Sequence, residues 1–356
     1  MANQLLFGFE RLADVAAERV STVGADVINT AIQQSVAEHN RQMDAMLSLF
    51  CTRTTQFSIR YRTPTAARLQ GVDESGRARP IRWAGHYDVA FPLQAGAAAW
   101  GGTDVAVAKM TVQEANDATA TLTTADARWV RDHILAALFA SSDWTFTDDE
   151  HGSLTIHGLA NGDAVTYLLM DGADAGATDT HYLAQASAID SSHDPFPTIW
   201  SDLTEHPENS GECVALIPSG LKTAVMGLAG YNPVANANIR PGANSDMLVG
   251  SLGVGTPGTV FGYHDSGVWL VEWRAMVANY IVAVMTAGER PLAMREDPEP
   301  ELRGFNQVGT RNDHPFQESQ WRRRAGFGGY NRVGAVCYYI GGGSWAVPSN
   351  YGSPMA

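Results

Sequence analysis

Apolar residues recur at helical spacing through a long segment that begins at Thr111. Spacings of three, four or seven separate the positions of this stripe: Val112, Ala115, Ala118, Leu122, Ala125, Trp129 and Ala136. Thr111 and Glu114 match a Ser/Thr-x-x-Glu capping box, in which hydroxyl and carboxylate bind free backbone donors of the first turn. The pattern predicts one helix from Thr111 to Ser141, about 45 Å long at about 1.5 Å per residue. The β-branched threonines from Thr119 to Thr124 lower helix propensity and favour a bend or short interruption there.

Upstream of this helix, strand signals predict a long two-stranded arm from Ser58 to Lys109 with almost no core of its own. Ser58 to Arg62 alternates polar and apolar residues, Val72 to Gly76 supplies a turn, and Ala90 to Leu93 leads into the small-residue stretch Ala95 to Gly102. A two-stranded ribbon is marginal in water, and its unpaired edges invite another chain. The arm therefore indicates a protein built for assembly.

The segment from Gln4 to Phe50 carries two helical stretches, around 27–32 and 43–49, and we interpret it as an arm that packs elsewhere. Alternation at Thr145–Thr147 and Leu154–Ile156 around a glycine-containing turn predicts a small sheet.

A compact α/β subdomain is predicted between residues 180 and 290. Cys213 to Ile217 is a short apolar run typical of a buried strand, and Pro218 and Ser219 begin a helix. Three further strands are predicted at Thr259–Phe261, Val268–Val271 and Tyr280–Val284. An acidic connector, Asp297 to Glu301, then leads to strand character over 317–340.

Composition narrows the function classes. The 356 residues are 45% hydrophobic and 17% charged, as in globular proteins, with no apolar run of membrane-spanning length and no signal-peptide pattern at the start. Cys51, Cys213 and Cys337 have neither disulfide-framework nor zinc-site spacing, which fits a reducing cytoplasm. The formal net charge of −14 argues against a general nucleic-acid binder. Lys109 and Lys222 are the only lysines, so arginine supplies the other cations, either for ordered interface ion pairs or through GC-rich codon usage.

The order of these elements, with the strings MTVQEAN at Met110–Asn116 and RRRAGFGGYNRVGAV at Arg322–Val336, resembles tailed-bacteriophage major capsid proteins of the Hong Kong 97 type. The resemblance covers nearly the whole chain and implies an α+β, Hong Kong 97-like capsid fold. The parts it implies are an N-terminal arm (1–56), an E-loop hairpin (57–109), a long spine helix with the first part of the P-domain (110–179), an inserted α/β A-domain (180–290), and P-domain return strands with a C-terminal tail (291–356).

The resemblance implies a structural protein and not an enzyme. Subunits of this kind self-assemble as hexamers and pentamers into an icosahedral shell around double-stranded DNA, without sequence-specific DNA binding, cofactor or membrane. It implies a separate scaffolding protein, a portal and, for some shells, a decoration protein, with assembly in the host cytoplasm and residence in the virion capsid. An encapsulin-type compartment enclosing a cargo enzyme is an alternative with the same fold.

Charged side chains supply the assembly-interface candidates. They are Arg60, Arg62, Arg68 and Arg77 in the predicted arm, Arg322, Arg323 and Arg324 near the end, and Glu299 and Glu301 in the acidic connector. We expect the Arg322–Arg324 cluster to pair with carboxylates of an adjacent subunit, such as those in Asp297–Glu301; a solvated basic strand face is the alternative.

One departure from the family concerns covalent cross-linking. Some relatives join an E-loop lysine to an asparagine of a neighbouring subunit, but residues 58–108 contain no lysine here. Subunits are therefore expected to remain unlinked.

Enzyme chemistry has weaker candidates. His151 and His157 follow Asp148–Glu150 and could bind a divalent metal, although exposed hairpin polarity explains them better. Asp190–Asp194 contains Ser, His and Asp, but a triad is defined by spatial geometry. Gly250–Gly255 lacks the lysine of a phosphate loop and is expected to be a loop near the capsomer axis. Trp269 and Trp273 are expected in the core. A soluble α/β metal-dependent enzyme is the remaining alternative.

Overall fold

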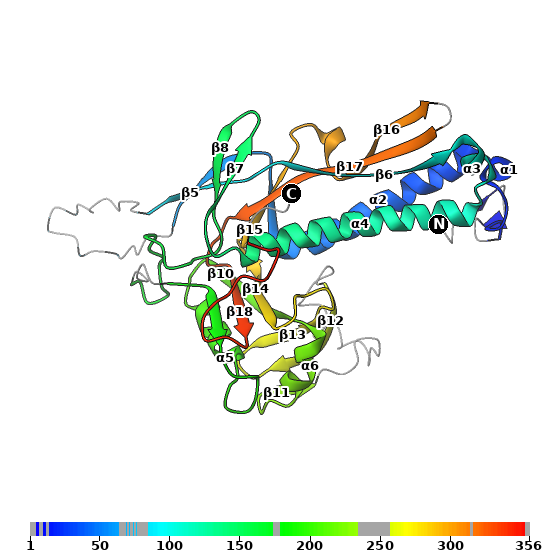
Figure 1. Cartoon of the computed structure of the whole chain (residues 1–356). Coiled ribbons are helices and arrows are strands. Elements are labelled where there is room, and N and C mark those ends of the chain that lie inside the picture. Colours follow the sequence, from blue (N-terminus) through cyan, green and yellow to red (C-terminus); the bar gives the residue numbers. More distant parts are fainter. Residues whose placement is uncertain are drawn as a thin grey trace. The chain divides into compact units, whose positions relative to one another are not determined.

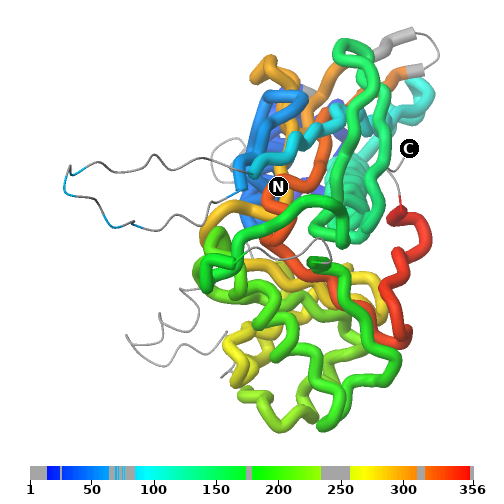
Figure 2. The backbone as a smooth tube through the Cα atoms, turned by 90° about the vertical axis from the view of Figure 1, so that its left-hand side faces the viewer, coloured from blue at the N-terminus to red at the C-terminus, as the bar shows by residue number. Residues whose placement is uncertain are grey.

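The computed structural model describes residues 5–6, 10–11, 14–63, 69, 71, 74, 76, 85–173, 179–233, 257–313 and 316–352. The chain divides into two compact units (Figures 1 and 2). The first unit comprises Met1–Ala45, Leu93–His133 and Arg295–Gly326, and the second comprises Met46–Pro92, Ile134–Met294 and Phe327–Ala356.

Four helices begin in the first unit: α1 (Val20–Val23), α2 (Ala25–Phe50), α3 (Asp104–Lys109) and α4 (Val112–Phe139). The predicted long helix is confirmed as α4, and its capping box forms: the Thr111 amide donates to Glu114 Oε2 at 2.8 Å, and the Glu114 amide donates to Thr111 Oγ1 at 3.2 Å. The helix is continuous through the threonines, so the expected interruption is absent. Their hydroxyls donate to helix carbonyls one turn earlier, as Thr119 does to Ala115 at 2.8 Å.

The amino-terminal segment differs from its prediction in two ways. Its two expected helical stretches are one continuous helix, α2, and that helix packs inside its own unit. Ile28, Ala31, Ile32 and Val36 form an i, i+3, i+4 stripe whose buried partners include Leu122 of α4. The interpretation as an arm that packs elsewhere is therefore wrong for α2, since its apolar face already has partners.

The small-residue stretch of the predicted arm is also placed differently. It forms β6 (Gln94–Thr103), which pairs antiparallel with β17 (Phe316–Gly329) from Gln94↔Ala325 to Thr103↔Phe316. On its other side β17 pairs with β16 (Phe305–Asp313). The expected single arm from Ser58 to Lys109 is thus wrong beyond Phe91, because β6 finds its strand partner more than 200 residues later in the chain.

The remaining short elements are β1 (Leu5–Leu6) paired with β2 (Glu10–Arg11), β3 (Cys51–Thr54), β15 (Leu292–Glu296) and the 3-10 turn η1 (Pro300–Leu302).

A seven-stranded sheet organises the second unit, in the order β11-β12-β13-β10-β14-β18-β9. Its strands are β9 (Tyr182–Gln185), β10 (Asn209–Ile217), β11 (Tyr231–Pro233), β12 (Thr259–His264), β13 (Val268–Glu272), β14 (Tyr280–Gly288) and β18 (Ala335–Ile340). Strand pairs β10·β13 and β18·β9 are parallel and the others antiparallel. Segments far apart in sequence, green, yellow and red in Figure 2, meet in this sheet.

The strands and helix predicted between residues 180 and 290 form, but their sheet also takes in β18 from outside that range. Cys213–Ile217 is fully buried in β10, Ser219 begins α6 (Ser219–Met226), and the three later strands are β12, β13 and β14. Helix α5 (Phe196–Thr204) presents Phe196, Ile199 and Leu203 to the same core. The three cysteines are buried and free.

Two hairpin-like pairs complete the second unit. Strand β4 (Ser58–Tyr61) pairs with β5 (Tyr87–Ala90), and Tyr61, Tyr87 and Val89 pack with Tyr167 and Val333. This base of the predicted arm therefore has a core. The turn predicted at 72–76 lies mostly outside the described residues. The predicted small sheet is confirmed as β7 (Trp144–Asp148) paired with β8 (Gly152–Ile156).

Candidate functional site

The predicted assembly residues near the base of the arm lie at the surface. Arg60 on β4 and Asp88 on β5 form an exposed cross-strand pair, with Nε to Oδ1 at 2.7 Å and Nη2 to Oδ2 at 2.9 Å. Hydrogen bonding from Arg60 lowers the pKa of Asp88. Arg62 is also exposed. Arg68 and Arg77 lie outside the described residues.

The three consecutive arginines on β17 have separate environments. Arg323 is buried, with Nε 2.6 Å from Asp126 Oδ1 and Nη2 2.7 Å from Asp126 Oδ2. Arg324 forms an ion pair with Asp297 of the same chain. The expected pairing with an adjacent subunit is therefore wrong for Arg323, whose fork is occupied inside the unit, and the Asp297 partner of Arg324 is intrachain. Arg322 forms no ion pair with any residue that the structure describes.

The acidic connector has one buried carboxylate, which bonds within its own chain, and two exposed ones. Asp297 is buried and its Oδ1 accepts a hydrogen bond from the Glu299 amide at 3.0 Å, while Arg303 Nε donates to the Asp297 carbonyl at 2.8 Å. Glu299 and Glu301 are exposed. These two carboxylates remain candidates for contact with another subunit.

Arg332, in the second unit, is a structural residue that the sequence reasoning missed. Its side chain is 1% exposed, and it donates from Nε to the Gly158 carbonyl at 2.8 Å and from Nη2 to the Leu159 carbonyl at 3.0 Å. It also forms an ion pair with Asp163. An arginine in a glycine-rich string gave no signal of this, because its partners lie about 170 residues earlier.

The candidate catalytic groups do not converge. His151 pairs with Asp148 at 2.9 Å and stacks on Phe57, whereas His157 pairs with Asp143 at 2.8 Å. The two histidines thus have different partners, as expected for hairpin polarity.

The 190–194 loop is a local turn. Asp190 Oδ1 accepts from the Ser192 amide at 2.7 Å and the His193 amide at 3.0 Å, and it contacts the His193 ring at 2.9 Å. No described serine hydroxyl bonds to His193, so the loop holds no triad. The loop predicted at 250–255 lies outside the described residues, and Trp269 and Trp273 are buried as predicted.

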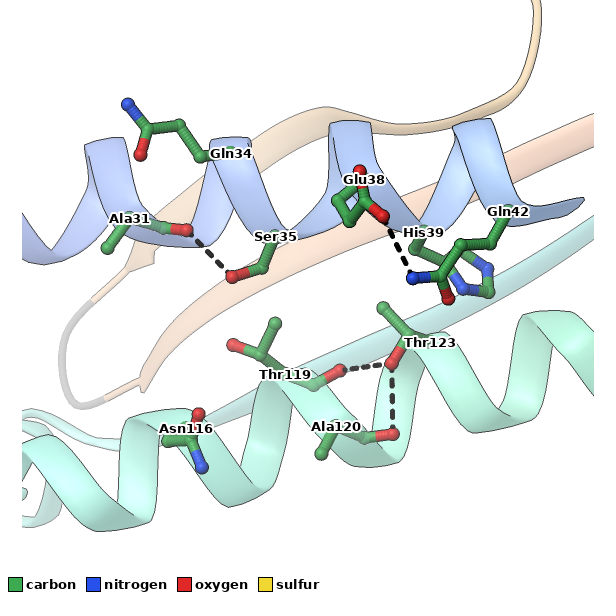
Figure 3. A pocket seen from close by; sticks show the side chains of 10 residues that line it. All are labelled: Ala31, Gln34, Ser35, Glu38, His39, Gln42, Asn116, Thr119, Ala120 and Thr123. Atoms are coloured by element: carbon green, nitrogen blue, oxygen red, sulfur yellow. Dashed lines mark hydrogen bonds between the residues drawn. The ribbon is translucent and has the colours of Figure 1, made fainter. Parts of the chain in front are cut away.

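A polar groove of about 580 Å³ lies between α2 and α4 within the first unit (Figure 3). Its hydroxyl groups donate to backbone carbonyls of their own helices, as Ser35 Oγ does to Ala31 O at 2.9 Å and Thr123 Oγ1 to Thr119 O at 3.1 Å, and Gln42 Nε2 donates to Glu38 Oε1 at 2.9 Å. No cluster of metal-binding side chains lies in this groove among the described residues.

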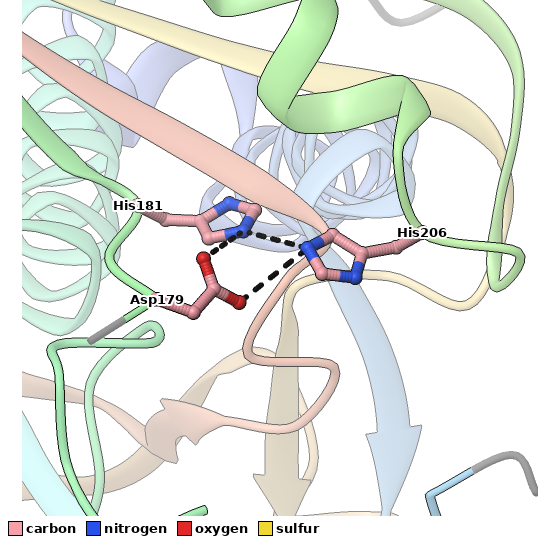
Figure 4. Close-up of side chains that lie close together, drawn as sticks. All are labelled: Asp179, His181 and His206. Atoms are coloured by element: carbon pink, nitrogen blue, oxygen red, sulfur yellow. Dashed lines mark hydrogen bonds and ion pairs between the residues drawn. The ribbon is translucent and has the colours of Figure 1, made fainter. Parts of the chain in front are cut away.

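One cluster in the second unit does bring ligand atoms together: Asp179, His181 and His206 (Figure 4). Asp179 and His181 precede β9, and His206 follows α5. Both imidazoles are fully buried, and the facing atoms of the three side chains lie within 4.8 Å of one another. The sequence reasoning missed this cluster. The Asp-x-His pair at 179 and 181 was visible, but its third member lies 25 residues on.

Burial shifts the pKa values of the titratable groups in and around this cluster. Burial lowers the pKa of His181 to about 3, with the nearby His206 contributing, so this ring is neutral. Burial also raises the pKa of Asp179, Glu205 and Glu208.

Comparisons with known proteins give matches in structure alone. No family model and no curated protein matches the chain. A solved structure titled "Mycobacterium phage Patience" aligns over 100% of both chains, with a TM-score of 0.65 and 18% identity. "Capsid of native GTA particle computed with C5 symmetry" aligns over 84% of this chain and 90% of that one (TM-score 0.47, 12% identity). "Asymmetric unit of bacteriophage PhiM1 mature capsid" aligns over 82% and 85% (TM-score 0.48, 9% identity).

The class of fold follows from the full-length match. The chain has an α+β, Hong Kong 97-like capsid fold, and the resemblance seen in the sequence is confirmed at the level of the fold. No helix among the described residues is long and apolar enough to cross a membrane.

Proposed function

We propose that this chain is the major capsid subunit of a tailed bacteriophage, whose copies assemble as hexamers and pentamers into an icosahedral shell around double-stranded DNA. The observation that carries the proposal is the fold shared along 100% of both chains with the phage Patience structure. A structural subunit needs no active site, which agrees with the separate partners of His151, His157 and His193.

Within this proposal, the surface around β4 and β5 is an inter-subunit contact. The β4·β5 pair has no further strand partner among the described residues, and such edges favour pairing with another chain. Leu69 is fully exposed and Phe57 is partly exposed. We restrict the proposed E-loop to the segment around β4 and β5, because β6 belongs to the first unit and pairs there with β17.

The accessible charged candidates are also proposed to form contacts between subunits. Arg60, Arg62, Arg322, Glu299 and Glu301 are accessible or partly accessible, and we assign them to contacts between subunits. Arg68 and Arg77 belong to the same proposal on sequence grounds. The net charge of −14 limits adhesion of the shell to packaged DNA by like-charge repulsion.

The partners follow from the same proposal. A scaffolding protein and a portal would act during assembly in the host cytoplasm, a decoration protein could bind outside, and the product would reside in the virion capsid. No cofactor is required.

Size-exclusion chromatography and negative-stain electron microscopy of the purified chain test the proposal. Closed icosahedral particles or capsomer rings are the expected result. A monomer or small oligomer that persists on concentration and on co-expression with a scaffold would contradict it. Nuclease-protected double-stranded DNA inside particles from infected cells would support a virion shell, whereas a protein cargo without DNA would favour the compartment alternative.

A further inference from the structure

The two buried imidazoles in the second unit have their protons fixed by the backbone. His181 Nδ1 lies 2.9 Å from the carbonyl oxygen of Ala335, and His206 Nδ1 lies 3.1 Å from that of Leu168. A carbonyl oxygen can only accept, so each Nδ1 carries a proton and each neutral ring has its lone pair on Nε2. This is the outer contact that metal-binding histidines usually make, because it fixes the tautomer and orients the ring.

Both lone pairs then face the same point. The two Nε2 atoms are 3.3 Å apart, and neither ring has a hydrogen left to place between them (Figure 4). Two lone pairs in contact in a dry interior repel each other unless a positive charge lies beside them. That charge could be a proton on one ring or a cation bound by both.

The Asp179 carboxylate faces both of these nitrogens. Asp179 Oδ1 lies 3.9 Å from His181 Nε2, and Asp179 Oδ2 lies 3.5 Å from His206 Nε2. The buried Oδ2 accepts no hydrogen bond from any described residue. Glu205 Oε1 also lies 3.5 Å from His206 Nε2, but its side chain is 39% exposed. A proton shared between the two Nε2 atoms leaves Asp179 Oδ2 without a hydrogen bond, whereas a divalent ion can bind both nitrogens and the carboxylate.

The spacing favours the ion. Zinc binds histidine nitrogen at about 2.0–2.1 Å and carboxylate oxygen at about 2.0–2.2 Å, so tetrahedral ligand atoms lie about 3.3–3.5 Å apart. The nitrogen pair at 3.3 Å and the pair of His206 Nε2 with Asp179 Oδ2 at 3.5 Å fit this spacing. Two neutral imidazoles with a carboxylate form a donor set typical of zinc.

We propose that Asp179, His181 and His206 form a site for a divalent transition metal, most suitably Zn²⁺. The ion would tie the segment before β9 to the segment after α5 inside the second unit. The site is independent of the capsid proposal, since it concerns the folding of one chain.

Metal content and zinc titration of an untagged chain test this site. The protein is stripped with a chelator, and Zn²⁺ is titrated against a chromophoric competitor while thermal unfolding is followed with and without zinc. We expect about one ion per chain, a higher melting temperature with zinc, and intense visible absorption when Co²⁺ replaces it, as four-coordinate sites show.

Variants locate the ion. His206→Gln and Asp179→Asn are each expected to weaken binding by more than about tenfold, because loss of even an outer contact costs about 10–100-fold. His193→Gln is the matched control, since that histidine is exposed and pairs with Asp190. If a variant fails to fold, the wild-type titration still decides. No zinc uptake and no thermal shift in the wild type would overturn the proposal, as would one ion retained in both ligand variants.

Discussion

Arg323 and Asp126 form a buried two-point ion pair inside the first unit, with Nε 2.6 Å from Oδ1 and Nη2 2.7 Å from Oδ2. Their side chains are 4% and 2% exposed. Asn40 Oδ1 accepts a further hydrogen bond from Arg323 Nη2 at 3.0 Å, and His39 Nε2 lies 2.7 Å from Asp126 Oδ2. One polar network therefore connects α2, α4 and β17.

Arg323→Met should destabilise the chain strongly. Removal of one partner leaves Asp126 as a buried charge with a weaker counterion, and such losses cost about 3–5 kcal/mol. Denaturant unfolding of dissociated subunits measures the change. Arg322→Met is the control, because Arg322 is more exposed and has no ion pair among the described residues; its expected cost is below about 1 kcal/mol. Equal effects of the two substitutions would show that the buried pair adds nothing.

The same pair predicts an acid-dependent loss of stability. Burial alone raises the pKa of Asp126, but hydrogen bonds from His39 and Arg323 outweigh burial and hold this pKa below its ordinary value. A carboxyl whose pKa is lower in the folded state stabilises that state above its unfolded pKa of about 3.9, and loses this contribution as the pH falls through the folded value. The free-energy difference between wild type and Asp126→Asn should therefore be constant above about pH 5 and shrink below about pH 4. Unfolding midpoints measured across this range provide the check, and a difference independent of pH would contradict it.

Gly101→Ala should disrupt the pairing of β6 with β17. Gly101 lies opposite Glu318, and an added Cβ would stand 2.3 Å from the carbonyl oxygen of Gln317 and 2.8 Å from the Cα of Glu318. Backbone atoms cannot move aside cheaply, so the expected cost is about 1–3 kcal/mol, seen as a lower melting temperature. Gly309→Ala on β16 is the matched control, since no atom lies within 4 Å of its added Cβ. Comparable melting temperatures for the two variants would refute this account.

The elements that the sequence predicted well depend on local patterns. Helix α4 was predicted from its apolar stripe and its capping box, and β10 from a short apolar run. These patterns involve only residues close together in the sequence, and both elements form as expected. The small-residue stretch of β6 was recognised but misassigned, because its strand partner is set by the fold and not by neighbouring residues.

The candidate sites show the same division. A run of three arginines predicted a charged surface, but the alternation of a strand places Arg323 in the interior beside Asp126 while Arg322 stays more exposed. The Asp179, His181 and His206 cluster joins two separate segments, so no spacing rule for local ligand pairs could find all three. Arg332 was missed for the same reason.

Arg332→Lys should destabilise the second unit although it keeps the charge. The guanidinium donates hydrogen bonds to the carbonyl oxygens of Gly158 and Leu159 and pairs with the carboxylate of Asp163, each through a different nitrogen. A lysine ammonium presents a single point and leaves buried acceptors without a donor, at a cost of about 3 kcal/mol. Thermal unfolding measures the loss. Arg274→Lys, where the side chain is 89% exposed, is the control and should change the melting temperature little. A tolerated Arg332→Lys would mean that charge alone is needed there.

Lysine placement predicts that assembled subunits stay covalently separate. An isopeptide bond needs a lysine amine that reaches a neighbour in its unprotonated form. Lys222 Nζ donates a hydrogen bond to Glu272 Oε2 of its own chain at 2.7 Å, and Lys109 is at the end of α3 and not within the β4·β5 segment. Assembled particles boiled in detergent should therefore migrate as a single-chain band. A ladder of multimers would contradict this, and its loss in Lys109→Arg or Lys222→Arg would identify the lysine responsible, because arginine keeps the charge but cannot form the bond.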